Sequence, residues 1–325
     1  MSNGKTVILN ILLFAGIVVL GTFIFADKSD ANFKPVVKGF VDQRKISPEE
    51  KYINSKLKNF TNDNSWEPKV ELGTVNQPEI AAEAGMLVDI NTGNILFEKN
   101  ANERRKIASL VKIMTAVLSL EHKSLNDKVY VTANASSVGE NSMGISEGEV
   151  YTIEELLYGL ILHSGNDAAY ALAEGTAGDA ETFVFWMNLK ARELGLKDTY
   201  FTDPSGLNDD TYSTPADLVK LTKYALENED FKKIVSTVEK ELSGNTHKYL
   251  HLYNQTNLLA SYPGVAGVKT GYTEEAGLCL VTYASNENKE VVGVVLKSID
   301  RKGDMILMLD HSYATLGINI EHNLL

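Results

Sequence analysis

The sequence has one cysteine, Cys279, and only seven prolines and two tryptophans among its 325 residues. A single cysteine cannot close a disulfide within the chain, and it excludes a metal site built from several cysteines. Positive charge is also scarce, because 31 Lys and Arg residues stand against 43 Asp and Glu and leave a formal net charge of −12. Since a nucleic-acid surface needs a basic face, we expect no nucleic acid as a partner.

Charged residues are missing altogether from residues 6–26, near the start of the chain. As a helix this stretch spans about 30 Å, the thickness of a bilayer core. A cleaved signal peptide has a shorter apolar core and small residues before the cut. Ile24 does not fit that pattern, although Ser29-Asp30-Ala31 leaves a cleavage site open. We expect residues 1–26 to form an uncleaved single-pass membrane anchor, with cleavage and secretion as the alternative.

Residues 27–79 are polar and contain few apolar clusters, which is typical of a linker. Within this linker, Ser47 as N-cap, Pro48 at the first helical position and Glu50 at the third predict a short helix to about Phe60. Patterned apolar segments begin after the linker, so residues 80–325 are expected to form the globular domain.

The globular part has strand patterns at both ends and helix patterns between them. Hairpins are predicted over 85–98 and 278–297. Helices are predicted over 109–122, 152–163, 166–177, 180–194, 215–227 and 303–316. An early and a late hairpin can join one antiparallel sheet with helices on both faces, so we expect an α+β domain and not a doubly wound parallel sheet.

A serine and a lysine three positions apart, Ser109 and Lys112, begin the first of these helices. On a helix the two side chains share a face, so the lysine amine can activate the serine hydroxyl as a nucleophile. Lysine is a base only when neutral, and its ordinary pKa is about 10.4, so burial and nearby positive charge must lower that pKa. Lys269 is the candidate for that charge. In isolation such a pair is more often a capping serine and a solvated lysine.

Two further strings complete a pattern. Ser164-Gly165-Asn166 lies at a turn between helices, where Ser164 can relay a proton and Asn166 can bond a substrate amide and a lysine. Lys269-Thr270-Gly271 is expected to open a strand whose edge can pair with an extended peptide. Gly271 would allow that backbone to come close, while Lys269 and Thr270 can hold a carboxylate. Capping or turn formation explains each string alone, but not the ordered trio.

The trio is typical of penicillin-binding proteins and class A β-lactamases. Residues 80–325 resemble the penicillin-binding domain of low-molecular-mass D-alanyl-D-alanine carboxypeptidases. Further segments that match are 88–93, 166–169, 203–208, 213–218 and 267–268. The resemblance implies a β-lactamase/transpeptidase-like fold without cofactor or metal. It also implies an extracytoplasmic enzyme that removes the terminal D-alanine from peptidoglycan stem peptides ending in D-Ala-D-Ala, with β-lactams as covalent inhibitors.

The resemblance also implies a role for each site residue. Ser109 would be acylated, Lys112 would be the base, and Ser164 with Lys269 would relay the proton. The backbone amides of Ser109 and Tyr272 would form the oxyanion hole. Asn166, Lys269, Thr270, Gly271, Tyr272 and Arg301 would bind substrate, with Thr270 on the terminal carboxylate and Arg301 assisting. Many relatives also carry a small C-terminal β domain and a membrane-binding helix, whose function the N-terminal anchor can replace.

Three alternatives remain open. A class A β-lactamase needs a glutamate three residues before Leu207, where this sequence has Pro204, so fast β-lactam hydrolysis is not expected. A transpeptidase would pass the acyl group to an amine instead of water. A membrane-anchored module that senses cell-wall peptides or antibiotics would need only the pocket, and would not require the lysine base.

Two other features have simpler explanations. His247 and His251 are four residues apart, a spacing that binds metal on a helix. The alternation of residues 249–253 predicts a strand instead, so we expect both histidines on the surface or in packing. Cys279 lies in an apolar strand and is expected in the core.

Overall fold

The structure is a computed structural model that describes residues 47–49, 52, 66–69, 76–256 and 258–324. The predicted anchor (1–26) and most of the predicted linker lie outside the described residues. Among the residues described, no helix is long and apolar enough to cross a membrane. Of the short helix predicted from Ser47, Pro48, Glu49 and Tyr52 are helical, and the remainder is not described.

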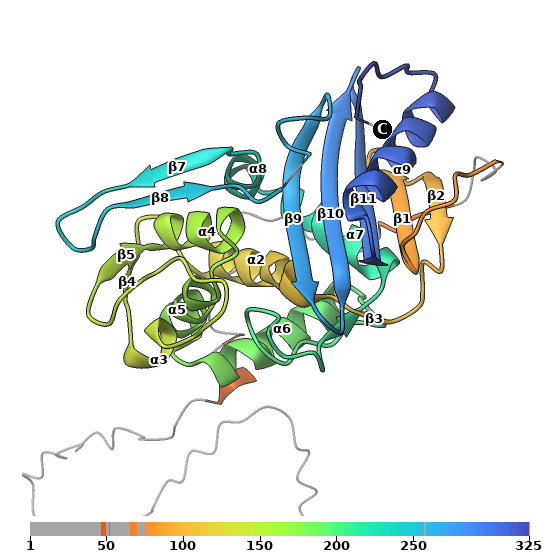
Figure 1. Ribbon diagram of the computed structural model, residues 1–325. Helices are drawn as coiled ribbons and strands as arrows, with labels where there is room; N and C mark the ends of the chain where they lie inside the picture. Colours follow the sequence, from red (N-terminus) through yellow and green to blue (C-terminus); the bar gives the residue numbers. More distant parts are fainter. Residues whose placement is uncertain (1–46, 50–51, 53–65, 70–75, 257, 325) are drawn as a thin grey trace, which may run out of the picture. The chain divides into compact units, whose positions relative to one another are not determined.

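A five-stranded antiparallel sheet unites the two ends of the globular part, as the sequence predicts (Figure 1). Its strand order is β2-β1-β11-β10-β9. The strands are β1 (Ala84–Asp89), β2 (Ile95–Lys99), β9 (Val265–Thr273), β10 (Gly277–Asn286) and β11 (Lys289–Ser298). The early and late hairpins meet where β1 pairs with β11, with Val88 opposite Val292.

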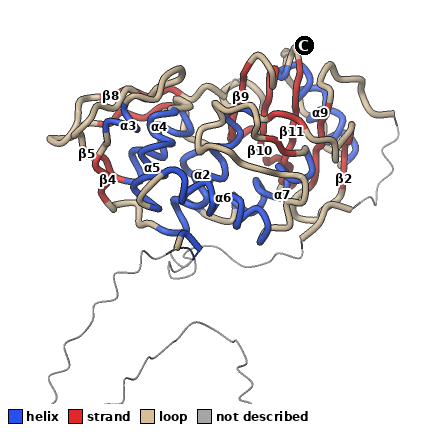
Figure 2. Tube along the Cα trace, turned by 90° about the horizontal axis from the view of Figure 1, so that it is seen from below, coloured by secondary structure: helices blue, strands red, loops and turns tan. Residues whose placement is uncertain are grey.

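Alternation along these strands divides their side chains between two apolar cores, because successive residues of a strand face opposite sides of the sheet. Met86 and Val88 face a core shared with the central helices, whereas Leu87 faces a core shared with α9 (Arg301–Thr315). Helix α9 packs on one face of the sheet and α7 (Pro215–Leu226) on the other. The expected α+β arrangement with helices on both faces is therefore confirmed (Figure 2).

The helical part lies beside β9 and is built around one central helix, α2 (Lys112–His122) (Figure 1). Every residue from Lys112 to Glu121 is buried, as expected for a helix that is apolar on nearly all sides. The helices around it are α3 (Ala133–Ser136), α4 (Ile153–Leu162), α5 (Asn166–Ala177), α6 (Ala180–Glu193) and α8 (Glu229–Val235).

Local capping fixes where several of these helices begin. Thr152 forms a capping box with Glu155 at the start of α4, and Thr214 caps α7 just before its first-turn proline. Asp300 caps α9 by accepting a hydrogen bond from the amide of Gly303. That helix therefore begins at Arg301, two residues earlier than the sequence predicts.

Three small strand pairs were not predicted as pairs. They are β3 (Arg105–Lys106) with β6 (Tyr212–Ser213), β4 (Lys128–Tyr130) with β5 (Val150–Thr152), and β7 (Glu239–Leu242) with β8 (Leu250–Tyr253). Only the alternation around β8 indicated a strand in advance. The others are too short to carry a periodicity, and partners distant in sequence define most of them.

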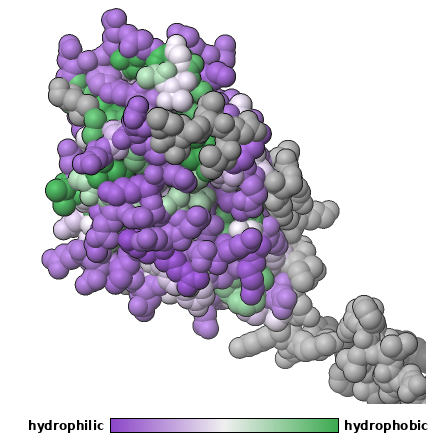
Figure 3. Space-filling model, turned by 90° about the vertical axis from the view of Figure 1, so that its right-hand side faces the viewer, coloured by the Kyte–Doolittle hydropathy of each residue, from purple (hydrophilic) through white to green (hydrophobic). Residues whose placement is uncertain are grey.

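The surface on the side of β2 and α9 is mainly hydrophilic, with small scattered hydrophobic patches (Figure 3). Cys279 is fully buried in β10, which confirms its predicted place in the core.

Candidate active site

Ser109 lies in a 3-10 turn, Ala108–Val111, that precedes α2. The sequence predicted an α-helix from Ser109 onwards, but the α-helix begins only at Lys112. The turn is strained, because Ala108 has a φ of +46°. The loop at residues 203–208 lies directly against it, since a Cβ on Gly206 would come 2.0 Å from the carbonyl oxygen of Ala108. The tighter turn is thus imposed by a distant loop.

The predicted serine and lysine are in contact. Lys112 Nζ lies 2.9 Å from Ser109 Oγ, 2.7 Å from Asn166 Oδ1 and 2.6 Å from the carbonyl oxygen of Ser205. The lysine is fully buried, whereas the serine is partly exposed. Asn166 Oδ1 and the Ser205 carbonyl can only accept hydrogen bonds, so they occupy two N–H groups of the amine. A neutral amine in this position would keep its lone pair for Ser109.

Burial lowers the pKa of Lys112 to about 7. The carboxylates of Asp203, Asp167 and Glu140 act in the opposite direction, and burial outweighs them. A substantial fraction of Lys112 is therefore neutral at neutral pH. The expectation that the charge of Lys269 lowers this pKa is wrong, because burial alone supplies the lowering. It is the pKa of Lys269 that charge repulsion lowers: burial lowers it most, and the charges of Lys112 and Arg301 lower it further.

Ser164 pairs with the second lysine. Lys269 Nζ lies 2.9 Å from Ser164 Oγ and 2.9 Å from the carbonyl oxygen of Thr270. Ser164 lies at the predicted turn between α4 and α5. Its φ of +57° is outside the range of a right-handed helix, so neither helix continues through it. The site therefore contains two serine–lysine pairs, each with its own amine.

Asn166, the first residue of α5, links Lys112 to a neighbouring loop. Its Nδ2 donates to the carbonyl of Gly139 at 3.0 Å, and its backbone amide donates to the carbonyl of Asn141 at 2.7 Å. The adjacent Asp167 accepts hydrogen bonds from the amides of Met143, Gly144 and Ile145 at 2.8, 2.8 and 3.1 Å. Helix α5 thus fixes the loop at residues 139–145 beside the two pairs.

Two residues of this site were not singled out from the sequence. Asp203 accepts hydrogen bonds from the amides of Ser205 and Gly206, each at 2.6 Å, and so turns the carbonyl of Ser205 towards Lys112. Asp167 holds the loop described above. The signals that could have identified them are the Asp-Pro-Ser-Gly turn sequence and the acidic residue in the first turn of α5.

The sequence predicted that Lys269-Thr270-Gly271 opens a strand. The string lies instead in the second half of β9, which begins at Val265. Residues 265–268 also pair with β10, so the strand begins four residues before Lys269. β9 is the last strand in the sheet order, so its outer edge carries no strand partner within the described sheet. Gly271 lies against the serine turn, because a Cβ there would come 2.9 Å from the carbonyl oxygen of Ile107 and 3.2 Å from the amide nitrogen of Ser109.

The remaining predicted binding residues surround this strand. Arg301 Nη1 donates to the carbonyl of Gly271 at 2.9 Å and to that of Cys279 at 3.3 Å, so its guanidinium supports the strand's backbone. Thr270 is 6% exposed and Tyr272 is 60% exposed. Burial lowers the pKa of Arg301, and its charge contributes to the positive potential at Lys269.

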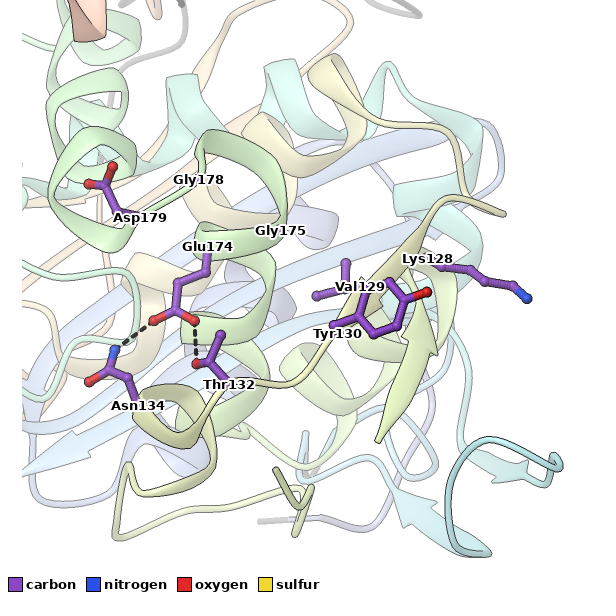
Figure 4. Close-up of a pocket in the computed structure, with 9 residues that line it drawn as sticks. All are labelled: Lys128, Val129, Tyr130, Thr132, Asn134, Glu174, Gly175, Gly178 and Asp179. Atoms are coloured by element: carbon purple, nitrogen blue, oxygen red, sulfur yellow. Dashed lines mark hydrogen bonds between the residues drawn. The ribbon is translucent and has the colours of Figure 1, made fainter. Parts of the chain in front are cut away.

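A separate pocket of about 480 Å³ lies at the far end of α5, and none of the predicted site residues lines it (Figure 4). Its Glu174 bonds Thr132 Oγ1 and Asn134 Nδ2, each at 2.6 Å. Within the described residues no cluster of His, Cys, Asp and Glu is arranged to hold a metal. His247 instead stacks on Tyr151, with ring centroids 4.3 Å apart, as a packing residue.

Known proteins resemble this chain in fold and in sequence. The family described as D-alanyl-D-alanine carboxypeptidase matches residues 72–299. The D-alanyl-D-alanine carboxypeptidase DacF of Bacillus subtilis (strain 168) is 39% identical over 242 residues, covering 72% of this chain and 62% of that protein. The D-alanyl-D-alanine carboxypeptidase of Streptomyces sp. (strain K15) is 37% identical over 265 residues, covering 74% of this chain and 90% of that protein.

Among solved structures, the Streptomyces K15 DD-transpeptidase has a TM-score of 0.70 at 35% identity, covering 74% of this chain and all of that one. The chain therefore spans less than two thirds of the Bacillus relative but nearly the whole of the Streptomyces protein. The matched region contains every site residue described above except Arg301, which lies just beyond the family match. The chain belongs to the D-alanyl-D-alanine carboxypeptidase family.

Proposed function

We propose that this chain is a serine D-alanyl-D-alanine carboxypeptidase that removes the terminal D-alanine of peptidoglycan stem pentapeptides through an acyl-enzyme on Ser109. The observation that carries the proposal is the contact of 2.9 Å between Ser109 Oγ and a fully buried Lys112 amine whose pKa is about 7. An amine that is neutral at neutral pH is the base that a serine hydroxyl needs.

In the acylation step, neutral Lys112 takes the proton of Ser109, and Oγ forms a bond to the carbonyl carbon of the penultimate D-alanine. The backbone amides of Ser109 and Tyr272 stabilise the oxyanion. The bond from that carbon to the nitrogen of the terminal D-alanine then breaks. The proton that Lys112 took passes through Ser164, which Lys269 holds at 2.9 Å, to the leaving nitrogen, so that Lys112 is neutral again.

Substrate binding uses the outer edge of β9. An extended peptide adds there as a further strand, because that edge has no partner in the described sheet. Asn166 bonds the substrate amide. Lys269 and Thr270 hold the terminal carboxylate, and Arg301 assists by fixing the backbone at Gly271 and by adding positive charge.

In the second step, neutral Lys112 takes a proton from water, which attacks the acyl carbon, and the proton returns to Oγ as the bond to Ser109 breaks. A class A β-lactamase speeds this step with a glutamate, but Pro204 stands at that position, and its carbonyl accepts a hydrogen bond from Thr115 Oγ1 at 2.6 Å. β-Lactams therefore acylate Ser109 and leave slowly, so they inhibit the enzyme.

Labelled penicillin and a D-Ala-D-Ala pentapeptide test this proposal together. Peptide mapping places the label on Ser109, and purified protein releases one D-alanine per peptide. Ser109→Ala abolishes both. Label retained in that variant would place the nucleophile elsewhere, rapid repeated hydrolysis of penicillin would make the protein a β-lactamase, and an intact pentapeptide after long incubation would favour a sensor module.

Transfer to an amine is a second candidate activity. The solved Streptomyces K15 protein is titled a DD-transpeptidase, whereas the curated protein from that strain is named a carboxypeptidase. Both outcomes start from the same acyl-enzyme. Mass spectrometry of stem-peptide products decides between them, because hydrolysis gives tetrapeptide and transfer gives cross-linked dimer.

We further propose that the catalytic domain lies outside the cytoplasm on a single-pass anchor formed by residues 1–26. Support comes from the uncharged stretch 6–26 and from the location of peptidoglycan. Fractionation with protease protection tests it, since an anchored domain stays with membranes and is digested from outside. Release of a shortened chain into the medium would show cleavage instead.

A further inference from the structure

The β7–β8 hairpin begins beside the proposed catalytic cleft and is fixed at both ends. At its base, Gln255 donates from its backbone amide to the carbonyl of Leu162 at 3.1 Å and from Nε2 to that of His163 at 3.3 Å. His163 directly precedes Ser164. At its tip, Thr246 exchanges hydrogen bonds with Val150 of β5. The hairpin therefore forms a rigid shelf over α4 that starts one residue from the catalytic turn (Figure 1).

The two faces of this hairpin differ sharply. Its inner face carries Leu242 and Leu252, which are 3% and 2% exposed, and Lys240, whose Nζ lies 4.7 Å from the centre of the Tyr158 ring. Strand alternation places the other residues on the opposite side, which we call the outer face. The outer face consists of Glu239, Glu241, Tyr249, His251 and Tyr253.

The outer face presents aromatic rings to solvent. Tyr249 is 58% exposed and Tyr253 is 55% exposed. With His251 between them, three rings repeat at every second residue, Tyr249 just before β8 and the other two within it. Large exposed aromatic residues grouped on one rigid element mark a binding surface, since single exposed ones are ordinary but a row is not.

Two of these rings, those of His251 and Tyr253, are held in place by polar contacts. Tyr253 Oη lies 3.1 Å from His251 Nδ1, and His251 Nε2 lies 3.2 Å from Glu239 Oε2. The His251 and Tyr253 ring centroids are 4.3 Å apart. This part of the outer face is thus held in one arrangement before a ligand binds, which lowers the entropy cost of binding.

The chemistry of the outer face selects one kind of occupant. Flat rings take the C–H face of a sugar, while the carboxylates of Glu239 and Glu241 accept hydrogen bonds from hydroxyl and amide donors. The same carboxylates repel a polyanion and disfavour a purely apolar partner. A chain of uncharged N-acetylated amino sugars offers C–H faces to the rings and hydroxyl and amide donors to the carboxylates. Peptidoglycan carries its stem peptides on such a chain.

We propose that the outer face of the β7–β8 hairpin binds the amino-sugar strand of peptidoglycan and so holds the polymer beside Ser109. This inference rests on the proposed function, because it assigns the second binding site to the same polymer. It predicts that the enzyme distinguishes a stem peptide within the polymer from the same peptide free in solution.

The direct test is retention of purified protein on chitin, an insoluble and uncharged chain of N-acetylated amino sugars that carries no stem peptides. Tyr249→Ala combined with Tyr253→Ala lowers the affinity about tenfold or more, since each ring contact is worth up to about a factor of ten. The matched Tyr249→Phe and Tyr253→Phe pair keeps the rings and retains most of the binding. Tyr130→Ala, at a tyrosine on β4 that is 73% exposed, leaves binding unchanged (Figure 4).

The kinetic test separates this inference from the proposed function. In the double alanine variant, KM for polymeric substrate rises while D-alanine release from a free pentapeptide stays at the wild-type rate. Equal retention of the wild type and the variant on chitin would overturn the inference, as would capture of a protein partner alone. Binding to chitin by Ser109→Ala, which has no turnover, shows the sugar site even if the carboxypeptidase proposal fails.

Discussion

At the residue scale, the site depends on removing a lysine from water. Lys112 is charged in the unfolded chain up to a pKa of about 10.4. Burial lowers its folded pKa to about 7. Between these two values the unfolded state binds more protons, so the stability contributed by this group rises as pH rises from 7 towards 10. Below pH 7 the buried ammonium costs its full penalty, which the hydrogen bonds to Asn166 and Ser205 only partly offset.

The rate of acylation should follow this titration. We expect labelling by penicillin to rise with pH through an apparent pKa near 7. Glu140 is exposed and its charge raises the pKa of Lys112, so Glu140→Gln shifts the profile to lower pH and speeds labelling at pH 6. Glu147→Gln, on the same loop but without that influence, is the control. A shift in the control alone, or a shift of Glu140→Gln to higher pH, would refute this account.

Removing the amine tests the base directly. Lys112→Met keeps most of the side-chain volume, and we expect it to lower the acylation rate by about a hundredfold to ten-thousandfold. Circular dichroism should show an intact fold, and the pH dependence of stability between 7 and 10 should flatten. Labelling near the wild-type rate would assign the base to another group.

At the element scale, a turn and a loop that are distant in sequence shape one another. The 3-10 turn around Ser109 and the loop at residues 203–208 approach so closely that Gly206 has no room for a side chain. Its φ of +83° also favours glycine. The nucleophile is therefore placed by contact between elements and not by the helix that follows it.

Gly206→Ala should disturb both folding and chemistry. The new Cβ would lie 2.0 Å from the carbonyl oxygen of Ala108, so the loop or the turn must move. We expect a loss of about 2 kcal/mol or more in the free energy of unfolding, together with slower acylation. Gly148→Ala is a matched control, because its φ is +82° but no atom lies within 4 Å of the added Cβ. Equal effects of the two changes in urea denaturation would attribute the loss to φ strain alone.

At the scale of the whole molecule, a buried ion pair ties the helical part together. Lys190 of α6 lies 2.6 Å from Glu121 of α2, with side chains 2% and 0% exposed. Tyr224 of α7 donates to the same carboxylate at 2.5 Å. The segment before the globular part joins nearby, since Tyr52 donates to Glu193 at 2.7 Å and Trp186 donates to the carbonyl of Pro48 at 2.7 Å.

Breaking this pair should destabilise the fold without touching the chemistry. Lys190→Met leaves the Glu121 carboxylate buried without its cation, and we expect a loss of about 3–5 kcal/mol in thermal or urea unfolding. Arg104→Ala, which breaks an ion pair with 54% and 43% exposed side chains, should cost much less, because exposed ion pairs contribute little to stability. Well below the melting temperature the acylation rate of Lys190→Met should match the wild type. An equal cost in both variants would show that the buried pair adds nothing.

Much of the fold could be predicted because its signals are local. Strand patterns identified the two hairpins, apolar periodicity located the main helices, and the apolar surroundings of Lys112 indicated burial. The β3–β6 and β4–β5 pairs could not be predicted in this way, because each strand has a partner distant in sequence and is too brief to show a period.

The sequence by itself determined that Ser109 and Lys112 are three residues apart in a helical segment, whereas contact with the loop at residues 203–208 decided the 3-10 geometry of the turn around Ser109. It also determined the turn that presents Ser164. Only the tertiary structure decided that Ser164 pairs with Lys269, that Asp203 aims the carbonyl of Ser205 at Lys112, and that burial alone lowers the pKa of Lys112. Those contacts join residues up to 105 positions apart. Packing of whole elements creates these contacts, and no local sequence pattern predicts them.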